Sequence, residues 1–268
     1  MPERHRLDAA LAERGLARSR THAARLIADN VVTVNGATVS KASQLVGPEQ
    51  ALALTASDHY VSRAAYKLRA GLDAFGVAVD GRLALDVGAS TGGFTQVLLE
   101  RGAARVIALD VGHGQLAASI ADDARVTVIE GFNARSMTAA TLAAVAGAAN
   151  RPDLVVADLS FISLPTVLPA LVDTVGVAAD YVVLIKPQFE VGRAGIRDGI
   201  VKDPRLRANA VSGVLQAAWD LGLPTAGLIR SPIAGTAGNR EYLAWFNSAV
   251  GANPTEWTDR VSVIADPS

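Results

Sequence analysis

From residue 62 onward, short continuous apolar runs alternate with segments whose apolar residues recur at helical spacing. The runs predict strands over 83–87, 105–110, 126–130, 154–158, 181–185, 226–231 and 242–246. The other segments predict helices over 62–75, 93–101, 115–120, 138–146, 164–172 and 205–221. Strands that alternate with helices in this way predict a mostly parallel, doubly wound α/β sheet with helices on both faces.

The first 57 residues follow a different pattern. Apolar residues at helical spacing predict two short helices around 7–11 and 23–27, and we expect Gly15 to end the first and Ser19 to cap the second. Residues 31–36 predict a strand that runs into a tight turn, and 51–54 predict a further strand. We therefore expect a small α+β domain over 1–57, a linker over 58–61 and the α/β domain over 62–268.

Charge separates the same two regions. Residues 1–41 hold seven Lys or Arg and four Asp or Glu, a net charge of +3 (7 − 4), whereas the whole chain carries −1. A nucleic-acid surface is therefore expected to be local and to lie in the first region. We expect Arg4, Arg6, Arg18 and Arg20 to contact RNA there, chiefly at its phosphates.

Absences narrow the function classes further. The chain has no cysteine, which excludes disulfides, thiolate metal ligands and a cysteine nucleophile, and its four histidines form no metal-binding cluster. No apolar run approaches the roughly 20 residues of a membrane-spanning helix. The N-terminal residues are charged, unlike those of a signal peptide. We expect a cytoplasmic protein with no metal and no membrane partner.

A loop of small residues follows the first predicted strand of the sheet and leads into a helix. Its candidate ligand-binding residues are Asp86, Gly88, Ala89, Ser90, Thr91, Gly92, Gly93 and Phe94. Small residues here let a ligand approach the backbone closely. A dinucleotide fingerprint needs glycine where Ser90 stands, and Asp86 would repel a pyrophosphate. S-adenosylmethionine (SAM) carries an ammonium and a sulfonium but no phosphate, so the loop favours SAM.

The next two strands also end in candidate ligand residues. Asp110 ends the second strand, where a carboxylate can accept hydrogen bonds from both ribose hydroxyls of an adenosine; the alternative is that it caps the turn before Gly112. We place Val111 in the same site. Asn133 follows the third strand, where an adenine contact and a turn are equally plausible.

Polar residues that could perform chemistry follow the fourth and fifth strands. Asp158 and Lys186 both come after apolar runs, so both are expected at the carboxyl edge beside the small-residue loop. A structural salt bridge between them is the alternative to a catalytic role. Lys67, on the first helix, and Glu241, before the last strand, would each be interpreted alone as surface charges. Arg63 is expected to contact phosphate or solvent.

The small-residue loop resembles that of FtsJ-like ribose 2′-O-methyltransferases, and nearly the whole chain resembles the TlyA family of bacterial rRNA 2′-O-methyltransferases, some of them named hemolysins. Residues 6–8, 19–20 and 34–36 are similar to an S4 RNA-binding domain. The segments Asp-Leu-Ser-Phe-Ile-Ser at 158–163, Lys-Pro-Gln-Phe-Glu at 186–190 and Gly-Asn-Arg-Glu-Tyr at 238–242 match family signatures.

The resemblance implies a fold, a catalytic group and a substrate. The fold would be a Rossmann-like SAM-dependent methyltransferase domain preceded by an S4 domain. The catalytic group would be Lys67, Asp158, Lys186 and Glu241. The substrate would be a cytidine ribose in 16S rRNA and, in some members, 23S rRNA, within ribosomal subunits.

Lys186 is our choice for the general base, with Lys67 as a nearby cation and the two carboxylates positioning the lysines. Burial and a second cation lower the pKa of a lysine whereas carboxylates raise it, so the sequence leaves the balance open. The alternative functions are a membrane-active hemolysin, a non-catalytic rRNA-binding factor and an N-methyltransferase. The last class tends to carry an Asn-Pro-Pro-Tyr-like segment where this chain has Asp-Leu-Ser-Phe at 158–161.

Overall fold

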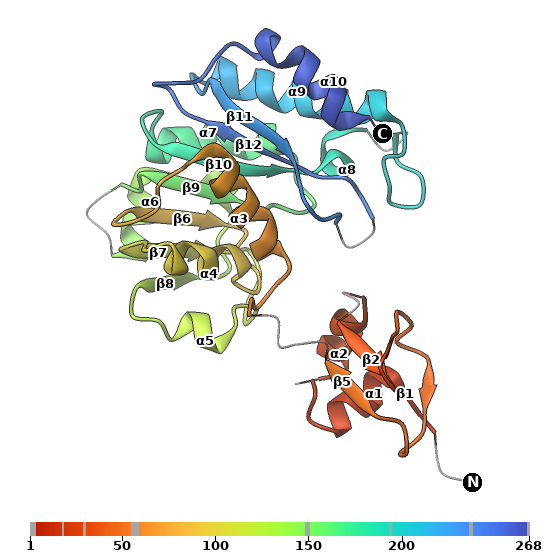
Figure 1. Cartoon of the computed structure of the whole chain (residues 1–268). Helices are drawn as coiled ribbons and strands as arrows, with labels where there is room; N and C mark the ends of the chain where they lie inside the picture. The colour runs from red at the N-terminus through yellow and green to blue at the C-terminus, as the bar shows by residue number, and fades with distance from the viewer. Residues whose placement is uncertain are drawn as a thin grey trace. The chain divides into compact units, whose positions relative to one another are not determined.

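A computed structural model describes residues 4–17, 19–28, 31–54, 59–147, 151–192, 195–235 and 238–266. Arg18 and Asp58, to which the sequence analysis assigned roles, lie outside these ranges. Contacts within the chain group it into two compact units, Met1–His59 and Tyr60–Ser268 (Figure 1).

The smaller unit packs two helices against short strands. Its elements are β1 (His5–Arg6), α1 (Leu7–Glu13), α2 (Arg20–Ala28), β2 (Val32–Val34), β3 (Ala37–Thr38), β4 (Leu45–Val46) and β5 (Leu52–Leu54). Leu7, Leu11 and Ile27 are almost fully buried in its core. As expected, Ser19 caps α2, because its Oγ accepts a hydrogen bond from the backbone N–H of His22.

The larger unit is built on a seven-stranded sheet in the order β11-β12-β10-β9-β6-β7-β8. Its strands are β6 (Leu83–Val87), β7 (Arg105–Leu109), β8 (Val126–Ile129), β9 (Leu154–Ala157), β10 (Asp180–Ile185), β11 (Thr225–Arg230) and β12 (Tyr242–Phe246). β6 to β10 pair in parallel, and β12 lies antiparallel between β10 and β11. The sheet therefore presents the carboxyl ends of six described strands at one edge.

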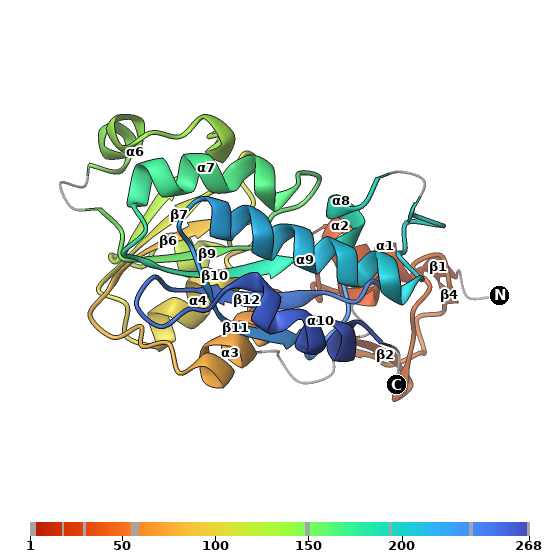
Figure 2. The same cartoon turned by 90° about the horizontal axis from the view of Figure 1, so that it is seen from above.

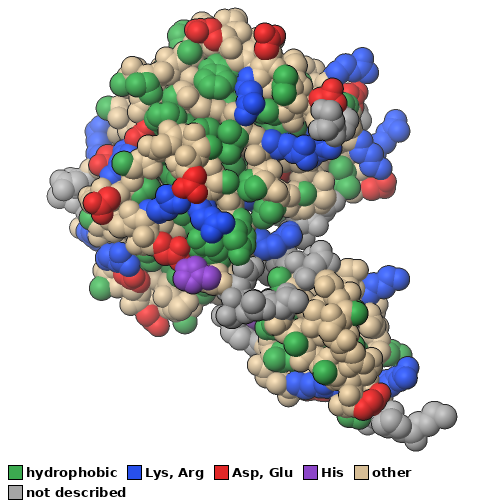
Figure 3. Space-filling model, viewed as in Figure 1, with side chains coloured by type: hydrophobic (Ala, Val, Ile, Leu, Met, Phe, Trp, Pro, Cys, Tyr) green, Lys and Arg blue, Asp and Glu red, His purple; other side chains and the backbone are tan. Residues whose placement is uncertain are grey.

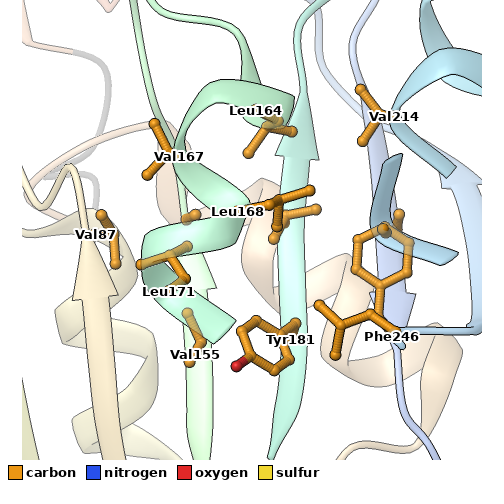
Figure 4. Packing of buried hydrophobic residues seen from close by; sticks show 14 of the residues in the cluster. Val87, Val155, Leu164, Val167, Leu168, Leu171, Tyr181, Val214 and Phe246 are labelled. Carbon is orange, nitrogen blue, oxygen red and sulfur yellow. The ribbon is translucent and has the colours of Figure 1, made fainter. Parts of the chain in front are cut away.

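Helices cover both faces of this sheet, as Figure 2 shows. They are α3 (Ala64–Phe75), α4 (Gly93–Glu100), α5 (Ala118–Ala121), α6 (Ala139–Ala146), α7 (Leu164–Val175), α8 (Pro187–Glu190), α9 (Pro204–Asp220) and α10 (Thr258–Ala265). Side chains alternate along each strand, so α3 and α4 share one core with Val156 and Leu184. The opposite core packs α7 and α9 on Val155, Tyr181 and Phe246 (Figure 4). The predicted fold class is confirmed.

Two helices were not predicted. α8 is too short to show a period, and it forms because Pro187 follows the end of β10 and opens a single turn. α10 is held by a buried arginine: the guanidinium of Arg207, on α9, donates two hydrogen bonds to the carbonyl of Ala265. This arginine ties the helix to the larger unit through contacts that no local pattern reveals.

Candidate active site

Lys186 lies in an ion pair at the carboxyl edge of the sheet. Its Nζ is 2.6 Å from Oδ1 of Asp158, the residue that follows β9. The same Nζ donates a hydrogen bond of 2.9 Å to Oγ of Ser160. Both charged side chains are largely covered, with 11% of Lys186 and 15% of Asp158 exposed. The salt bridge that the sequence offered as the alternative to a catalytic role is therefore present.

Lys67 on α3 makes a second, more deeply buried pair. Its Nζ lies 2.5 Å from Oε2 of Glu241, and the two side chains are 9% and 3% exposed. Gln188 donates a hydrogen bond of 3.4 Å to the other carboxylate oxygen of Glu241. Since removal of one partner would leave a buried charge without its counter-ion, this pair also supports the fold.

Strand pairing explains why these four residues meet. β9 and β10 are parallel neighbours, so Asp158 and Lys186 leave the sheet side by side. β12 runs antiparallel to β10 in a register that, continued by one residue, sets Glu241 opposite Lys186. α3 packs on β10 and β12 and brings Lys67 to the same edge. The four predicted catalytic residues thus form two neighbouring ion pairs of zero net charge.

The small-residue loop uses its glycines differently from our expectation. Gly88 and Gly92 have φ of +83° and +97°, and Ser90 has φ of +48°. A Cβ on Gly88 would lie 2.7 Å from the carbonyl oxygen of Asp158, and one on Gly92 would lie 2.9 Å from Leu116. These glycines therefore let the loop pack against the protein itself, and a valine at Gly92 would distort the loop rather than fill ligand space.

Asp86 lies beneath this loop and is fully buried. One of its oxygens accepts a hydrogen bond of 2.6 Å from Oγ1 of Thr95, a residue the sequence analysis missed. The other oxygen, Oδ1, has no hydrogen-bond partner among the described residues. Burial, with smaller contributions from the charges of Asp158 and Asp110, raises the pKa of this carboxyl to about 7.

The remaining candidate ligand residues divide into exposed and buried ones. Asp110 accepts hydrogen bonds from the backbone N–H of Ser90, at 2.8 Å, and of Gly112, at 2.7 Å, so it joins the loop to its own turn. Val111 beside it is 70% exposed.

Asn133 caps a short 3-10 turn through its Oδ1, as the turn alternative expected. Phe94, in the first turn of α4, is buried in the core. Among the other loop residues, Ala89 and Thr91 are nearly covered and Gly93 packs against α3.

Two aromatic residues near Lys186 were not anticipated. Phe161 is 91% exposed and holds a left-handed backbone with φ of +65°, which a bulky residue rarely adopts. Its ring centroid is 5.2 Å from that of Phe189, and Nζ of Lys186 is 5.9 Å from the latter ring. Glu190 fixes the two loops together, accepting hydrogen bonds from Ser163 Oγ and the backbone N–H of Leu164. On the face of the larger unit that is turned to the viewer, Figure 3 shows Lys and Arg side chains among hydrophobic ones.

Two of the candidate RNA-contacting arginines of the smaller unit, Arg6 and Arg20, share one carboxylate. Asp8 accepts two hydrogen bonds from Arg6, at 3.1 and 3.0 Å, and pairs with Arg20 at 3.4 Å. The arginine side chains remain 47% and 62% exposed, while Asp8 is nearly covered. Arg4 is exposed. In the larger unit, Arg63 stands at the N-terminus of α3, four residues before Lys67.

Metal-binding clusters and membrane-spanning helices are both absent from the described residues. Within those ranges, no group of three His, Asp or Glu side chains is arranged to hold a metal ion. No helix in them combines the length and apolar character needed to cross a membrane.

Comparison with known families agrees with this geometry. Residues 60–248 match the family of FtsJ-like methyltransferases, and residues 5–52 match the S4 domain. The fold and the site therefore define the class: an FtsJ-like methyltransferase that carries an S4 domain.

Individual relatives narrow the family. The chain is 50% identical over 251 residues to "16S/23S rRNA (cytidine-2′-O)-methyltransferase TlyA" of Mycobacterium tuberculosis, covering 92% of this chain and 91% of that protein. It is 37% identical over 242 residues to "Hemolysin A" of Brachyspira hyodysenteriae, covering 90% and 99%. A solved structure from Streptococcus thermophilus, described as a candidate hemolysin, matches with a TM-score of 0.76 and 35% identity, covering 99% and 96%. The chain belongs to the TlyA family.

Proposed function

We propose that this protein transfers a methyl group from SAM to the 2′-hydroxyl of a cytidine ribose in 16S or 23S rRNA within a ribosomal subunit. The observation that supports it best is the pairing of two lysines with two carboxylates beside the small-residue loop. The chain also shares 50% sequence identity with a relative that is named for that reaction.

The residues of the loop suit SAM. Asp86 has a buried oxygen without a partner among the described residues, and the nearby Asp110 and Asp158 add negative charge. These carboxylates favour a cationic ligand and disfavour a phosphate. Asp110 keeps further lone pairs for ribose hydroxyls, and the exposed Val111 offers apolar surface to an adenine. When bound, SAM supplies an electrophilic methyl group on a sulfonium.

The four residues Lys67, Asp158, Lys186 and Glu241, called the tetrad below, suit deprotonation of a ribose hydroxyl. Such a hydroxyl is a weak nucleophile, so a positioned base that takes its proton accelerates the reaction. Lys186, held in place by Asp158 and Ser160, would take this proton as the neutral amine, so the ammonium of the ion pair would first have to release its own proton. Lys67 is fixed by Glu241 and supplies a cation behind the site.

Phe161 and Phe189 suit a base that has been turned out of its stack. Enzymes that modify one nucleotide expose it from the RNA, and aromatic rings then stack on the base. An exposed phenylalanine in a left-handed conformation is costly, and such cost is typical of functional sites. We place the cytosine against Phe161, next to Lys186.

Phe161→Ala should lower kcat/KM for ribosomal subunits by about 5- to 150-fold, because stacking on one base contributes about 1–3 kcal/mol. SAM affinity and the melting temperature should not fall. Trp219→Ala is the control, since Trp219 is a partly exposed aromatic on α9. Equal effects of both substitutions on methylation would remove Phe161 from the substrate site.

Replacing Arg4, Arg6 and Arg20 by Gln should weaken rRNA binding at low salt and reduce its dependence on salt. Each phosphate contact that is lost lowers the slope of log K against log salt by about one. Arg101→Gln with Arg105→Gln, on the larger unit, serves as the control. An unchanged slope in the first variant would mean that the smaller unit does not bind RNA phosphates through these residues.

The proposed reaction is tested directly by adding the full chain and labelled SAM to unmethylated ribosomal subunits and locating the label by mass mapping. We expect a methyl group on a cytidine ribose of at least one subunit. A methylated base amine would instead indicate an N-methyltransferase. Binding of SAM and rRNA without transfer would indicate a non-catalytic rRNA-binding factor.

A further inference from the structure

Gln115 is an exposed residue that contacts the SAM-binding loop through Ser90. Its Oε1 accepts a hydrogen bond of 3.2 Å from Oγ of Ser90. The residues after it fix its position: the backbone N–H of Ala117 donates to the carbonyl of Thr91, and Leu116 packs against Gly92. The glutamine is thus attached to the loop rather than free on the surface.

The amide of Gln115 occupies the space beside Gly112. A Cβ built on Gly112 would lie 1.8 Å from Nε2 of Gln115 and 3.2 Å from Oδ1 of Asp110. The amide nitrogen and the carboxylate therefore flank one point. Among the described residues, no acceptor takes a hydrogen bond from this Nε2. The glutamine presents an exposed donor next to the carboxylate that we assign to the ribose.

A ribose hydroxyl both donates and accepts hydrogen bonds. Asp110 can satisfy only the donating side, because an ionised carboxylate only accepts. Its two oxygens already accept from the N–H groups of Ser90 and Gly112, which holds the carboxylate still and leaves its remaining lone pairs for hydroxyl protons. The amide of Gln115 supplies the donor that the oxygen of the same hydroxyl lacks.

We propose that Gln115 is a further SAM-binding residue, whose amide donates to a ribose hydroxyl held by Asp110, and that Gly112 leaves room for this amide. The inference rests on the proposed SAM-dependent function. The backbone conformation of Gly112 does not require a glycine, because its φ lies outside the left-handed region. The space that it leaves for the Gln115 amide is therefore the reason for a glycine here. The side chain of Gln115 would have to move away, whereas Oδ1 of Asp110, at 3.2 Å, would have to shift by only a few tenths of an ångström.

The test is calorimetric titration of the full chain with S-adenosylhomocysteine, and competition by its 2′,3′-dideoxy analogue. Gln115→Ala and Gly112→Ala should each weaken binding of S-adenosylhomocysteine by about three- to tenfold, the effect of one neutral hydrogen bond. The double variant should lose no more than the weaker-binding single variant, because both substitutions remove the same contact. Gln216→Ala, which removes an exposed glutamine of α9 bonded to Asp220, should bind as the wild type does.

The dideoxy analogue separates this contact from general damage to the site. Gln115→Ala should bind it as well as the wild type does, since no hydroxyl remains to accept the hydrogen bond. Unchanged affinity of Gln115→Ala for S-adenosylhomocysteine would overturn the proposal, and so would an equal loss toward both ligands. If the wild type bound neither SAM nor S-adenosylhomocysteine, the proposed SAM-dependent function itself would be wrong. That result differs from the loss or persistence of this one contact in the variants. Thermal melting verifies that each variant is folded.

Discussion

Lys186→Ala is expected to lower the single-turnover rate of methyl transfer to ribosomal subunits by about 100- to 10,000-fold, the usual contribution of a general base. SAM and rRNA binding should be retained, because the loop and the smaller unit are untouched. Lys186→Arg should fail as well, since a guanidinium stays protonated and cannot accept the hydroxyl proton. Lys202→Ala, an exposed lysine outside the tetrad, is the matched control and should be fully active.

The opposite role for Lys186 makes opposite predictions. If the lysine only neutralises Asp158, arginine should restore both activity and stability, and alanine should destabilise the fold by leaving a largely covered carboxylate unpaired. Methylation by each variant is therefore measured beside its thermal melting. An active, stable arginine variant would reject the base role. If the arginine variant is inactive but normally stable, the pH–rate profile of the wild type is measured next. A rate that rises with the deprotonation of one group would indicate a general base, whereas a flat profile would indicate that arginine only misplaces the substrate.

Strand ends were the part of the site that the sequence predicted best. Asp158 and Lys186 each follow a run of apolar residues, and runs of this kind end at one edge of a parallel sheet. The elements predicted from these runs agree with the observed strands to within a residue or two. The family assignment, made from short motifs around the same strand ends, is confirmed by the relatives.

Partners across the fold could not be predicted from patterns. Lys67 and Glu241 are 174 positions apart, and only the antiparallel placement of β12 beside β10 makes them neighbours. The family resemblance grouped the two residues, whereas composition and spacing alone would assign each to the surface. In the same way, no local signal indicates that Gly92 faces Leu116, because that contact depends on how the chain returns after β7.

Aromatic exposure was the other feature that escaped prediction. Phe161 lies in a motif that the sequence singled out, yet a phenylalanine is normally assigned to the core. Its left-handed φ turns the chain so that the ring faces solvent. Just after this turn, Oγ of Ser163 and the backbone N–H of Leu164 donate hydrogen bonds to the carboxylate of Glu190, at the end of α8.

Asp86→Asn is expected to change the pH dependence of stability and of SAM binding in opposite directions. In the folded protein the buried carboxyl keeps its proton up to about pH 7, whereas an ordinary aspartate ionises near 3.8. Between these values the folded state binds more protons than the unfolded state, so this group makes the free energy of unfolding fall as pH rises from about 4 to about 7. Each pKa unit corresponds to about 1.4 kcal/mol, so the total is on the order of a few kcal/mol.

Denaturant unfolding at pH 5.5 and pH 8 measures the first effect. Relative to the wild type, Asp86→Asn should gain stability at pH 8, because the asparagine carries no charge to bury. Its amide leaves unpaired donors near Thr95, at a cost of about 1–3 kcal/mol that does not vary with pH, so the change with pH is the quantity to compare. Asp122→Asn, at an exposed carboxylate after α5, provides the reference.

SAM binding should show the reverse sign. A bound cation stabilises the ionised carboxylate, so the wild type should bind SAM more tightly as pH rises through about 7 and should release a proton on binding below that pH. Asp86→Asn should bind SAM more weakly and lose this dependence, even at pH 8, where its fold has gained stability. Calorimetry in buffers of different ionisation enthalpy counts the released proton. A wild type that releases none at pH 6 would show that the charge of Asp86 takes no part in holding SAM.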